Sequence, residues 1–244
     1  FHPQPGGCYD CTVACKRIVS DGTLLPEYDQ LAAFGGLCGM ENLEQIAQLC
    51  SWCHDQGIDP VSYASEKTIA QAETAVTVKG LELPPYDPRA STGLALAYAT
   101  SPHGGSHLPA WPIASEILRK PVPTDRFSFD GKARVIAMFE DANAAVDCLS
   151  LCRFASAAVE LEELAALLAA VTGQSYCTAD LLRIGRRTIQ QERLFNQQCG
   201  FTAADDSLPQ RFFTESANGL APLDQQRFEQ ELAAYHRIRA AQCL

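Results

Sequence analysis

The sequence predicts an all-α, multihelical protein of two helical subdomains, and three observations support this. Long segments carry apolar residues at helical spacing, glycines stand where those segments should end, and no run of alternating residues indicates a sheet. A chain of 244 residues with 47% hydrophobic content can also bury a core well above the marginal size. We therefore expect a folded protein built mainly from packed helices.

The helices can be placed one by one from their apolar spacing and their end signals. Residues 41–57 have Gly57 as a C-cap, and Asp59-Pro60 is typical of a cap and first turn that open another helix directly afterwards. The predicted helices are residues 41–57, a segment that starts at 59–60, and residues 132–154, 159–173, 179–200 and 223–242, with Gly173 and Gly200 as stop signals.

Proline-rich stretches interrupt this helical pattern. Residues 81–90 and 101–112 are too short to be domains, so we expect ordered loops there. A further stretch, residues 119–131, separates an N-terminal helical region from a C-terminal one. We place a soft boundary in it, which gives subdomains 1–120 and 121–244.

Charge and hydropathy exclude several classes of protein. The formal net charge is -10 and the basic residues are scattered, whereas a nucleic-acid partner needs clustered cations. No apolar run approaches the roughly 18 residues of a membrane span, and no charged-then-apolar start indicates a signal peptide. We expect a cytoplasmic protein with no membrane span and no nucleic-acid partner. The chain begins with Phe1 rather than Met, which suggests processing or a fragment of a longer polypeptide.

The chain contains 11 cysteines, which is a high and odd number for its size. Disulfide-dense scaffolds are usually short and poor in helix, unlike this sequence. In a reducing compartment, some of the thiols would be buried and a subset would be ligands. Cys50 and Cys53 fit an apolar helix face beside Leu49, so we expect them in the core.

Cys8, Cys11 and Cys15 form a CxxCxxxC run that can supply three thiolates to one metal centre. Clusters of the four-iron type are commonly held by such a run and a remote fourth cysteine. A zinc site would more often show two paired elements, and the alternative to any metal is three buried thiols on one helical face. Glycines before the run and basic residues after it favour a loop-to-helix element. Spacing leaves the fourth ligand open, although Cys152 lies near an acidic residue and a helix end.

Five blocks of the sequence, in order, carry a resemblance to a known family. They are GCYDCTVACKR (7–17), LPEYDQLAAFGGLCGMENLEQIAQLCSWCHDQGID (25–59), LPPYDPRASTGLALAYATSPHGGSH (83–107), EDANAAVDCLSLCRF (140–154) and ERLFNQQCGFTAADDSLPQRFF (192–213). Together they resemble the C-terminal two, helical domains of the tungsten- or molybdenum-dependent aldehyde ferredoxin oxidoreductase family. The resemblance implies two helical subdomains joined by an iron-sulfur cluster.

The resemblance also implies two cofactors. One is a [4Fe-4S] cluster held by Cys8, Cys11, Cys15 and Cys152. The other is a tungsten (or molybdenum) bis-pyranopterin, the molybdopterin type of cofactor, whose metal is held by dithiolene sulfurs rather than by protein side chains. The residues implied to contact the pterin lie in two related motifs, with His54, Gly57, Ile58 and Asp59 in the first and Asp147 and Leu151 in the second.

Two further residues are implied to approach the metal and to handle protons or the substrate carbonyl. They are Glu27 and His107, and a carboxyl and an imidazole facing one cavity suit that role. Taken alone, Glu27 is a solvated carboxylate at a helix start and His107 a capped loop histidine. The sequence departs from the usual family pattern at Asp10 and Thr12 within the cysteine run, at His54 and Ser150 in the pterin motifs, and at His103 and Ser106 near the substrate loop.

The activity implied is oxidation of an aldehyde to a carboxylic acid, with electrons passed through the cluster to ferredoxin or a similar acceptor. The family's N-terminal pterin-binding domain is missing from this chain, so a separate subunit or a removed segment would supply it. Arg183, Arg186 and Arg187 could form a docking patch for the acceptor, and amphipathic helices explain them equally well. The alternatives are a non-catalytic iron-sulfur electron-transfer subunit that lacks a complete pterin site, and a helical zinc protein.

Overall fold

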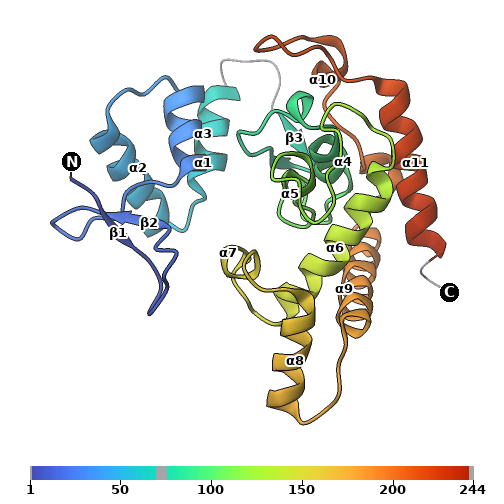
Figure 1. The fold of residues 1–244 in the computed structure, drawn as a ribbon. Coiled ribbons are helices and arrows are strands. Elements are labelled where there is room, and N and C mark those ends of the chain that lie inside the picture. The colour runs from blue at the N-terminus through green and yellow to red at the C-terminus, as the bar shows by residue number, and fades with distance from the viewer. Residues whose placement is uncertain (1, 70–75, 242–244) are drawn as a thin grey trace. The chain divides into compact units, whose positions relative to one another are not determined.

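The computed structural model describes residues 2–69 and 76–241 (Figure 1). The chain divides into two compact units, residues 1–76 and 77–244. Helices are the main regular structure of both units, and the strands found among the described residues are two or three residues long. The predicted all-α, multihelical fold class is therefore confirmed.

The boundary between the units differs from the predicted position near residue 120, because residues 119–131 pack into the second unit. The backbone N–H of Thr92 donates to the carbonyl oxygen of Arg126 at 2.8 Å, and the Thr92 hydroxyl donates to that of Ser128 at 2.6 Å. The Lys132 ammonium donates to the carbonyl oxygen of Asp125 at 2.8 Å. The proline-rich stretch is therefore part of the second unit rather than a linker.

The first unit begins with a small antiparallel hairpin and continues as helices. In the hairpin, Gln4 lies opposite Ile18 and Gly6 opposite Lys16. The unit consists of β1 (Gln4–Gly6), β2 (Lys16–Ile18), α1 (Tyr28–Leu31), the π-helix η1 (Ala32–Leu37), α2 (Leu43–Asp55) and α3 (Pro60–Ile69).

The core of the first unit forms where α2 and α3 pack with η1. Phe34 of η1 and Cys53 of α2 are almost fully buried, and Cys50 and Ala64 lie in the same cluster. The prediction that Cys50 and Cys53 belong to the core is confirmed. Burial raises the pKa of the Cys50 thiol to about 11, with a smaller contribution from Cys53, so this thiol stays protonated.

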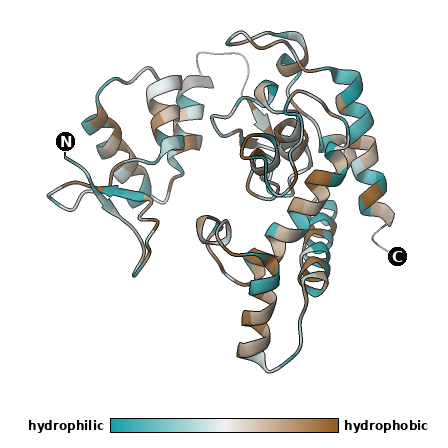
Figure 2. Cartoon of the chain, in the orientation of Figure 1, coloured by the Kyte–Doolittle hydropathy of each residue, from teal (hydrophilic) through white to brown (hydrophobic). Residues whose placement is uncertain are grey.

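The second unit is built around one short helix that is buried on every side. All nine residues of α4 are buried, from Thr92 to Thr100. Figure 2 shows α4 in the brown of hydrophobic residues, whereas α9 is mostly teal. The unit consists of β3 (Thr77–Val78), β4 (Leu81–Glu82), η2 (Pro88–Ala90), α4 (Thr92–Thr100), α5 (Ile113–Glu116), α6 (Lys132–Cys148), α7 (Arg153–Ser156), α8 (Leu161–Thr172), α9 (Thr178–Gln198), η3 (Ala203–Asp205), α10 (Arg211–Thr214) and α11 (Gln225–Ala241).

The long helices α6 and α9 pack against each other at close range (Figure 1). A Cβ atom at Gly185 of α9 would lie 1.7 Å from the carbonyl oxygen of Asp141 in α6, so only glycine allows this approach. The predicted helices 159–173 and 179–200 are observed as α8 and α9. The helix predicted at 223–242 is α11, and residue 242 lies outside the described residues.

Helix α11 is held on α6 by buried charges. Arg239 donates to Glu140 and to Asp141, each at 2.5 Å, and the Tyr235 hydroxyl donates to Glu140 at 2.6 Å. These four side chains are nearly inaccessible to solvent. Removing one partner of such a buried pair typically costs about 3–5 kcal/mol, because a charge is then left without compensation.

Among residues 2–69 and 76–241, no helix combines the length and the apolar character needed to cross a membrane.

Candidate functional site

The CxxCxxxC run lies in the loop of the first hairpin. Residues 7–15 connect β1 to β2, and Cys8, Cys11 and Cys15 are all exposed. The backbone N–H of Cys11 donates to the carbonyl oxygen of Cys8 at 3.1 Å, so the loop turns back on itself between the first two thiols. The predicted loop-to-helix element is wrong, because a strand follows the run. The exposure also contradicts the alternative of three buried thiols on a helix.

The loop bends through two residues with left-handed backbone conformations, Asp10 at φ 53° and Ala14 at φ 44°. Asp10 is one of the departures from the family pattern, and aspartate tolerates this conformation better than most residues. Among the described residues, no three His, Cys, Asp or Glu side chains stand close enough together to hold a single metal ion.

Cys152 lies at the start of α7, where it is exposed. The backbone N–H groups of Ala155 and Phe154 lower the pKa of its thiol, and the nearby charge of Arg153 acts in the same direction. A helix N-terminus favours a thiolate in this way, and the thiolate is the form that binds metals. Cys152 is therefore an exposed thiol whose surroundings favour the thiolate.

The second predicted pterin motif forms the C-terminal end of α6. The N–H of Leu151 donates to the carbonyl oxygen of Val146 at 3.3 Å, and the N–H of Ser150 donates to that of Asp147 at 2.9 Å. These two bonds make a Schellman motif, which ends the helix near residue 149 rather than at the predicted 154. The Asp147 carboxylate accepts two hydrogen bonds from Arg153, both 2.9 Å long.

The first predicted pterin motif has the same backbone geometry at the end of α2. The N–H of Ile58 donates to the carbonyl oxygen of Cys53 at 2.8 Å, and the N–H of Gly57 donates to that of His54 at 3.0 Å. The Asp59 carboxylate then accepts the N–H of Ser62 at 2.8 Å and caps α3.

The equivalent residues of the two motifs also share a backbone conformation. Gly57 has φ 68°, and Ser150 at the matching position has φ 56°. Serine thus keeps the turn that glycine usually makes. In both motifs a short turn leads directly into the next helix, with Asp59 at the cap of α3 and Cys152 at the cap of α7.

Glu27 and His54, predicted for different roles, are connected through Gln30. The backbone N–H of Glu27 donates to Oε1 of Gln30 at 3.0 Å, and Nε2 of Gln30 lies 3.3 Å from Nε2 of His54. The Glu27 carboxylate forms an ion pair with Lys16, the residue that follows Cys15. Gln30 was not among the predicted site residues, although the E-x-x-Q spacing at residues 27–30 is that of a capping box.

His107 lies in the loop after α4, where its ring packs edge-on against Tyr86 with the ring centroids 5.2 Å apart. In the same loop, Nε2 of His103 lies 3.6 Å from a carboxylate oxygen of Glu192 on α9. Glu192 raises the pKa of His103 through this contact, against the opposing effect of burial. His103, Glu192 and Asp147 all line a cavity of about 240 Å³. Glu192 is far from this loop in sequence, and no role was predicted for it, although it is the first residue of the block 192–213.

Two of the arginines considered as a docking patch are engaged within the second unit. Arg186 forms an ion pair with Asp141 at 3.2 Å, and Arg183 with Asp180. Structural contacts therefore account for part of that basic cluster.

Comparison with known proteins decides the family. The profile described as "Aldehyde ferredoxin oxidoreductase, domains 2 & 3" matches residues 1–70 and 63–240. The chain belongs to this family. The junction between the two matched segments of the aldehyde ferredoxin oxidoreductase profile lies close to the boundary observed at residues 76 and 77, well before residue 120.

Curated members of the aldehyde ferredoxin oxidoreductase family are similar along most of the chain. The tungsten-containing aldehyde ferredoxin oxidoreductase of Pyrococcus furiosus is 28% identical over 95% of this chain and 49% of its own length. That of Thermococcus kodakarensis is 27% identical with the same coverage. That of Pyrococcus horikoshii is 35% identical over 66% of this chain and 27% of its own length. The chain thus spans about half the length of the first two relatives.

Proposed function

We propose that this chain is the cluster-bearing and pterin-contacting part of an oxidoreductase that converts an aldehyde and water into a carboxylic acid. Membership of the aldehyde ferredoxin oxidoreductase family supports the reaction class. The observation that carries the proposal is the exposure of all four implied ligands, three of them in the β1–β2 loop and Cys152 at the start of α7. Their sulfurs are the donor set that a [4Fe-4S] cluster requires.

The residues present also fit a pterin cofactor. Two helix ends of matching geometry offer backbone groups and the polar side chains of His54 and Asp147. Gly57, Ile58 and Leu151 form the turns, and Asp59 holds the first turn to α3. When bound, a tungsten (or molybdenum) bis-pyranopterin would supply oxygen transfer to the carbonyl carbon and would take up two electrons.

The protein's own part in the reaction is to move protons and to orient the substrate. Conversion of an aldehyde and water into a carboxylic acid releases two protons and two electrons. Glu27 can hold a proton at its carboxylate, which the Lys16 ammonium keeps oriented. His107, seated against Tyr86, can hydrogen-bond the substrate carbonyl or accept the other proton at its ring. The electrons would leave through the cluster to ferredoxin or a similar carrier.

Metal analysis of the anaerobically purified chain tests the cluster assignment. We expect about four iron atoms per chain in the parent, and loss of most of that iron in Cys152→Ser, because a cluster of this type needs its fourth thiolate. Cys199→Ser is the matched control, since Cys199 is also exposed and lies outside the proposed ligand set. Unchanged iron in Cys152→Ser would contradict the assignment.

The second candidate is an iron-sulfur electron-transfer subunit without a complete pterin site. It is favoured by the same exposed cysteines, because they supply cluster ligands whether or not a pterin is bound. Tungsten or molybdenum together with iron would support the oxidoreductase. Iron alone, in the presence of the protein's native partners, would support the electron-transfer subunit, and zinc alone would exclude both.

A further inference from the structure

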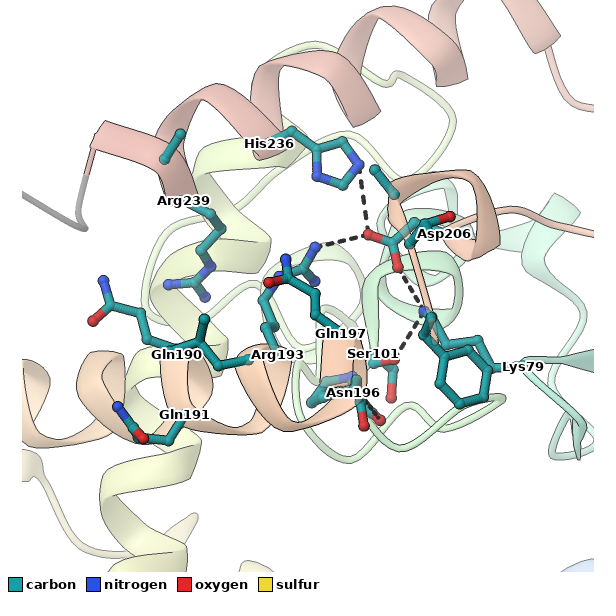
Figure 3. Close-up of a pocket in the computed structure, with 16 residues that line it drawn as sticks. Lys79, Ser101, Gln190, Gln191, Arg193, Asn196, Gln197, Asp206, His236 and Arg239 are labelled. Carbon is teal, nitrogen blue, oxygen red and sulfur yellow. Dashed lines mark hydrogen bonds and ion pairs between the residues drawn. The ribbon is translucent and has the colours of Figure 1, made fainter. Parts of the chain in front are cut away.

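The second unit contains a cavity of about 540 Å³ that none of the residues discussed above as cluster, pterin or substrate contacts lines. Figure 3 shows it between α9 and α11, with the loop after α4 and the segment around η3 closing one side. This volume is in the range of cavities that bind small organic molecules. The cavity is therefore a separate place in the molecule where a ligand could bind.

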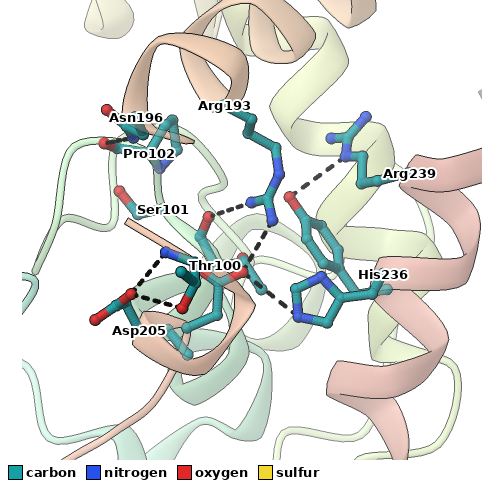
Figure 4. Close-up of polar contacts among 12 residues, drawn as sticks. Thr100, Ser101, Pro102, Arg193, Asn196, Asp205, His236 and Arg239 are labelled. Carbon is teal, nitrogen blue, oxygen red and sulfur yellow. Dashed lines mark hydrogen bonds and ion pairs between the residues drawn. The ribbon is translucent and has the colours of Figure 1, made fainter. Parts of the chain in front are cut away.

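Cationic side chains outnumber acidic ones on the walls of this cavity. Lys79, Arg193 and Arg239 line it, and Asp206 is the one carboxylate among its lining residues. Arg239 is paired with Glu140 and Asp141 of α6, which do not line the cavity. Figure 4 shows Arg239 and Arg193 on either side of a tyrosine ring. With these carboxylates counted, Lys79, Arg193 and Arg239 are matched by an equal number of acidic side chains, so binding of an anion depends on the cationic N–H donors that remain unused.

The contacts of each cation show which of them a ligand could reach. Lys79 donates to the carbonyl oxygens of Ala99 and Ser101 and pairs with Asp206 at 2.7 Å, which uses its three N–H groups. Arg193 donates to the carbonyl oxygen of Thr100 at 3.3 Å and to Asp206 at 2.9 Å (Figure 4). A guanidinium has five N–H groups, so Arg193 retains donors for a ligand.

His236 adds a polar group with unused hydrogen-bonding capacity. Its Nε2 atom is buried and makes no hydrogen bond within the described structure, and it lies 3.5 Å from a carboxylate oxygen of Asp206. A buried polar atom without a partner carries a desolvation cost that a bound ligand would remove. Arg193 and His236 both border the open centre of the cavity in Figure 3.

The rest of the wall contains both polar and apolar residues. The polar ones are Ser101, Gln190, Gln191, Asn196, Gln197 and Thr202. The side chains of Leu194 and Phe201 line the cavity together with Pro102, Ala203 and Ala240. These apolar side chains offer no hydrogen bond to the oxygens of a phosphate or sulfate, whereas they suit a ligand with one charged end and one apolar end.

We propose that this cavity binds a small organic carboxylate whose negative end meets Arg193 and His236 and whose apolar ring or short branched chain lies against Leu194 and Phe201. The proposal does not depend on the cluster or on the pterin. The site is separate from the residues of the second unit that are proposed to bind the cluster, the pterin or the aldehyde.

Titration of the chain with phenylacetate, followed by amide chemical shifts, tests the site. We expect saturable shifts at residues around the cavity with a millimolar or tighter dissociation constant, and binding of the neutral isostere phenylacetamide that is at least about tenfold weaker. Inorganic sulfate should also bind at least about tenfold more weakly, because it cannot use the apolar wall. Equal binding of phenylacetate and phenylacetamide, or no shifts near the cavity, would overturn the proposal.

Two neighbouring glutamines on α9 provide a matched pair of variants. Gln197 lines the cavity and Gln198 does not, and both are exposed, so each should tolerate glutamate. Gln197→Glu should weaken phenylacetate binding about tenfold through repulsion between the two carboxylates, and Gln198→Glu by less than about twofold. Equal effects of the two variants would contradict the site. Thermal melting shows whether both variants fold. If either variant does not fold, the comparison of phenylacetate with phenylacetamide on the parent chain still tests the proposal.

Discussion

At the scale of single residues, His103 and His236 lie in the same unit and in opposite electrostatic surroundings. Glu192 raises the pKa of His103, so the folded state favours its charged form. Burial lowers the pKa of His236, helped by Arg193 and Lys79, and Asp206 only partly offsets this. His103 should therefore stabilise the fold most at acidic pH, whereas His236 should destabilise the fold as the pH becomes acidic.

We expect His103→Gln to lower the melting temperature more at about pH 5.5 than at about pH 8. The stabilisation from the charged ring is fully present below the ordinary pKa of 6.5 and is lost as the pH rises through the raised value. Melting curves at the two pH values measure this difference.

His236→Gln should show the reverse dependence. The unfolded chain takes up a proton at His236 before the folded chain does, so the parent loses stability as the pH falls below 6.5 towards the lowered pKa. The variant lacks this loss, and the stability cost of the substitution should shrink from about pH 8 to about pH 5.5. The same direction of change in both variants would contradict the assigned surroundings.

Residue patterns in the sequence predicted some of these roles and not others. Burial of Cys50 and Cys53 follows from an apolar helix face, and the helix-start position of Glu27 was anticipated. Glu192 could not be predicted, because it meets His103 only after α9 packs beside the loop that follows α4. The roles of the proposed ligand and pterin residues are still predictions.

At the scale of elements, the helix ends at Gly57 and Ser150 share one geometry and differ in one side chain. A left-handed conformation costs a residue with a Cβ roughly 1–2 kcal/mol. Glycine avoids this strain, but it loses more conformational entropy on folding, so the net gain from glycine is smaller. Ser150→Gly should therefore stabilise the second unit by about 0.5–1 kcal/mol.

Gly57→Ser is the matched control for Ser150→Gly and should destabilise the first unit by a similar amount. Urea unfolding, followed by probes within each unit, measures both changes. A neutral or destabilising Ser150→Gly would indicate that the serine side chain stabilises the turn by a contact that offsets its backbone strain.

Elements with a clear apolar period were predicted well, and the missed elements have a physical explanation. Helix α4 is buried on every side, so its sequence has no polar face and no period. The strands are two or three residues long, which is too short for an alternating pattern. The turn at Ser150 ended α6 early because a serine there adopts a conformation that the sequence pattern associates with glycine.

At the scale of the whole molecule, the position of the boundary depends on tertiary packing. Residues 119–131 are rich in proline, which is typical of a linker. Their carbonyl oxygens nevertheless accept hydrogen bonds from Thr92 of α4 and from Lys132. Composition cannot distinguish a proline-rich linker from a proline-rich cover of a buried helix. Division at residues 76 and 77 became evident only from the contacts.

The proposed cluster would join the two units, because Cys8, Cys11 and Cys15 belong to one and Cys152 to the other. We expect calorimetry of the iron-free chain to resolve two unfolding transitions, and the iron-loaded chain to unfold in a single transition at higher temperature. Cys199→Ser should behave like the parent. Two unchanged transitions after iron loading would contradict a cluster shared between the units.

The division of the four proposed sulfur donors between the units has a consequence for biosynthesis. The hairpin loop leaves the ribosome before α6 does, within a unit that has its own core, and it then presents three exposed thiols without the fourth. Cys152 becomes available only after α6 has been translated. Insertion of the cluster would therefore be a late event, and until then the loop would need protection from oxidation and from competing metals such as zinc.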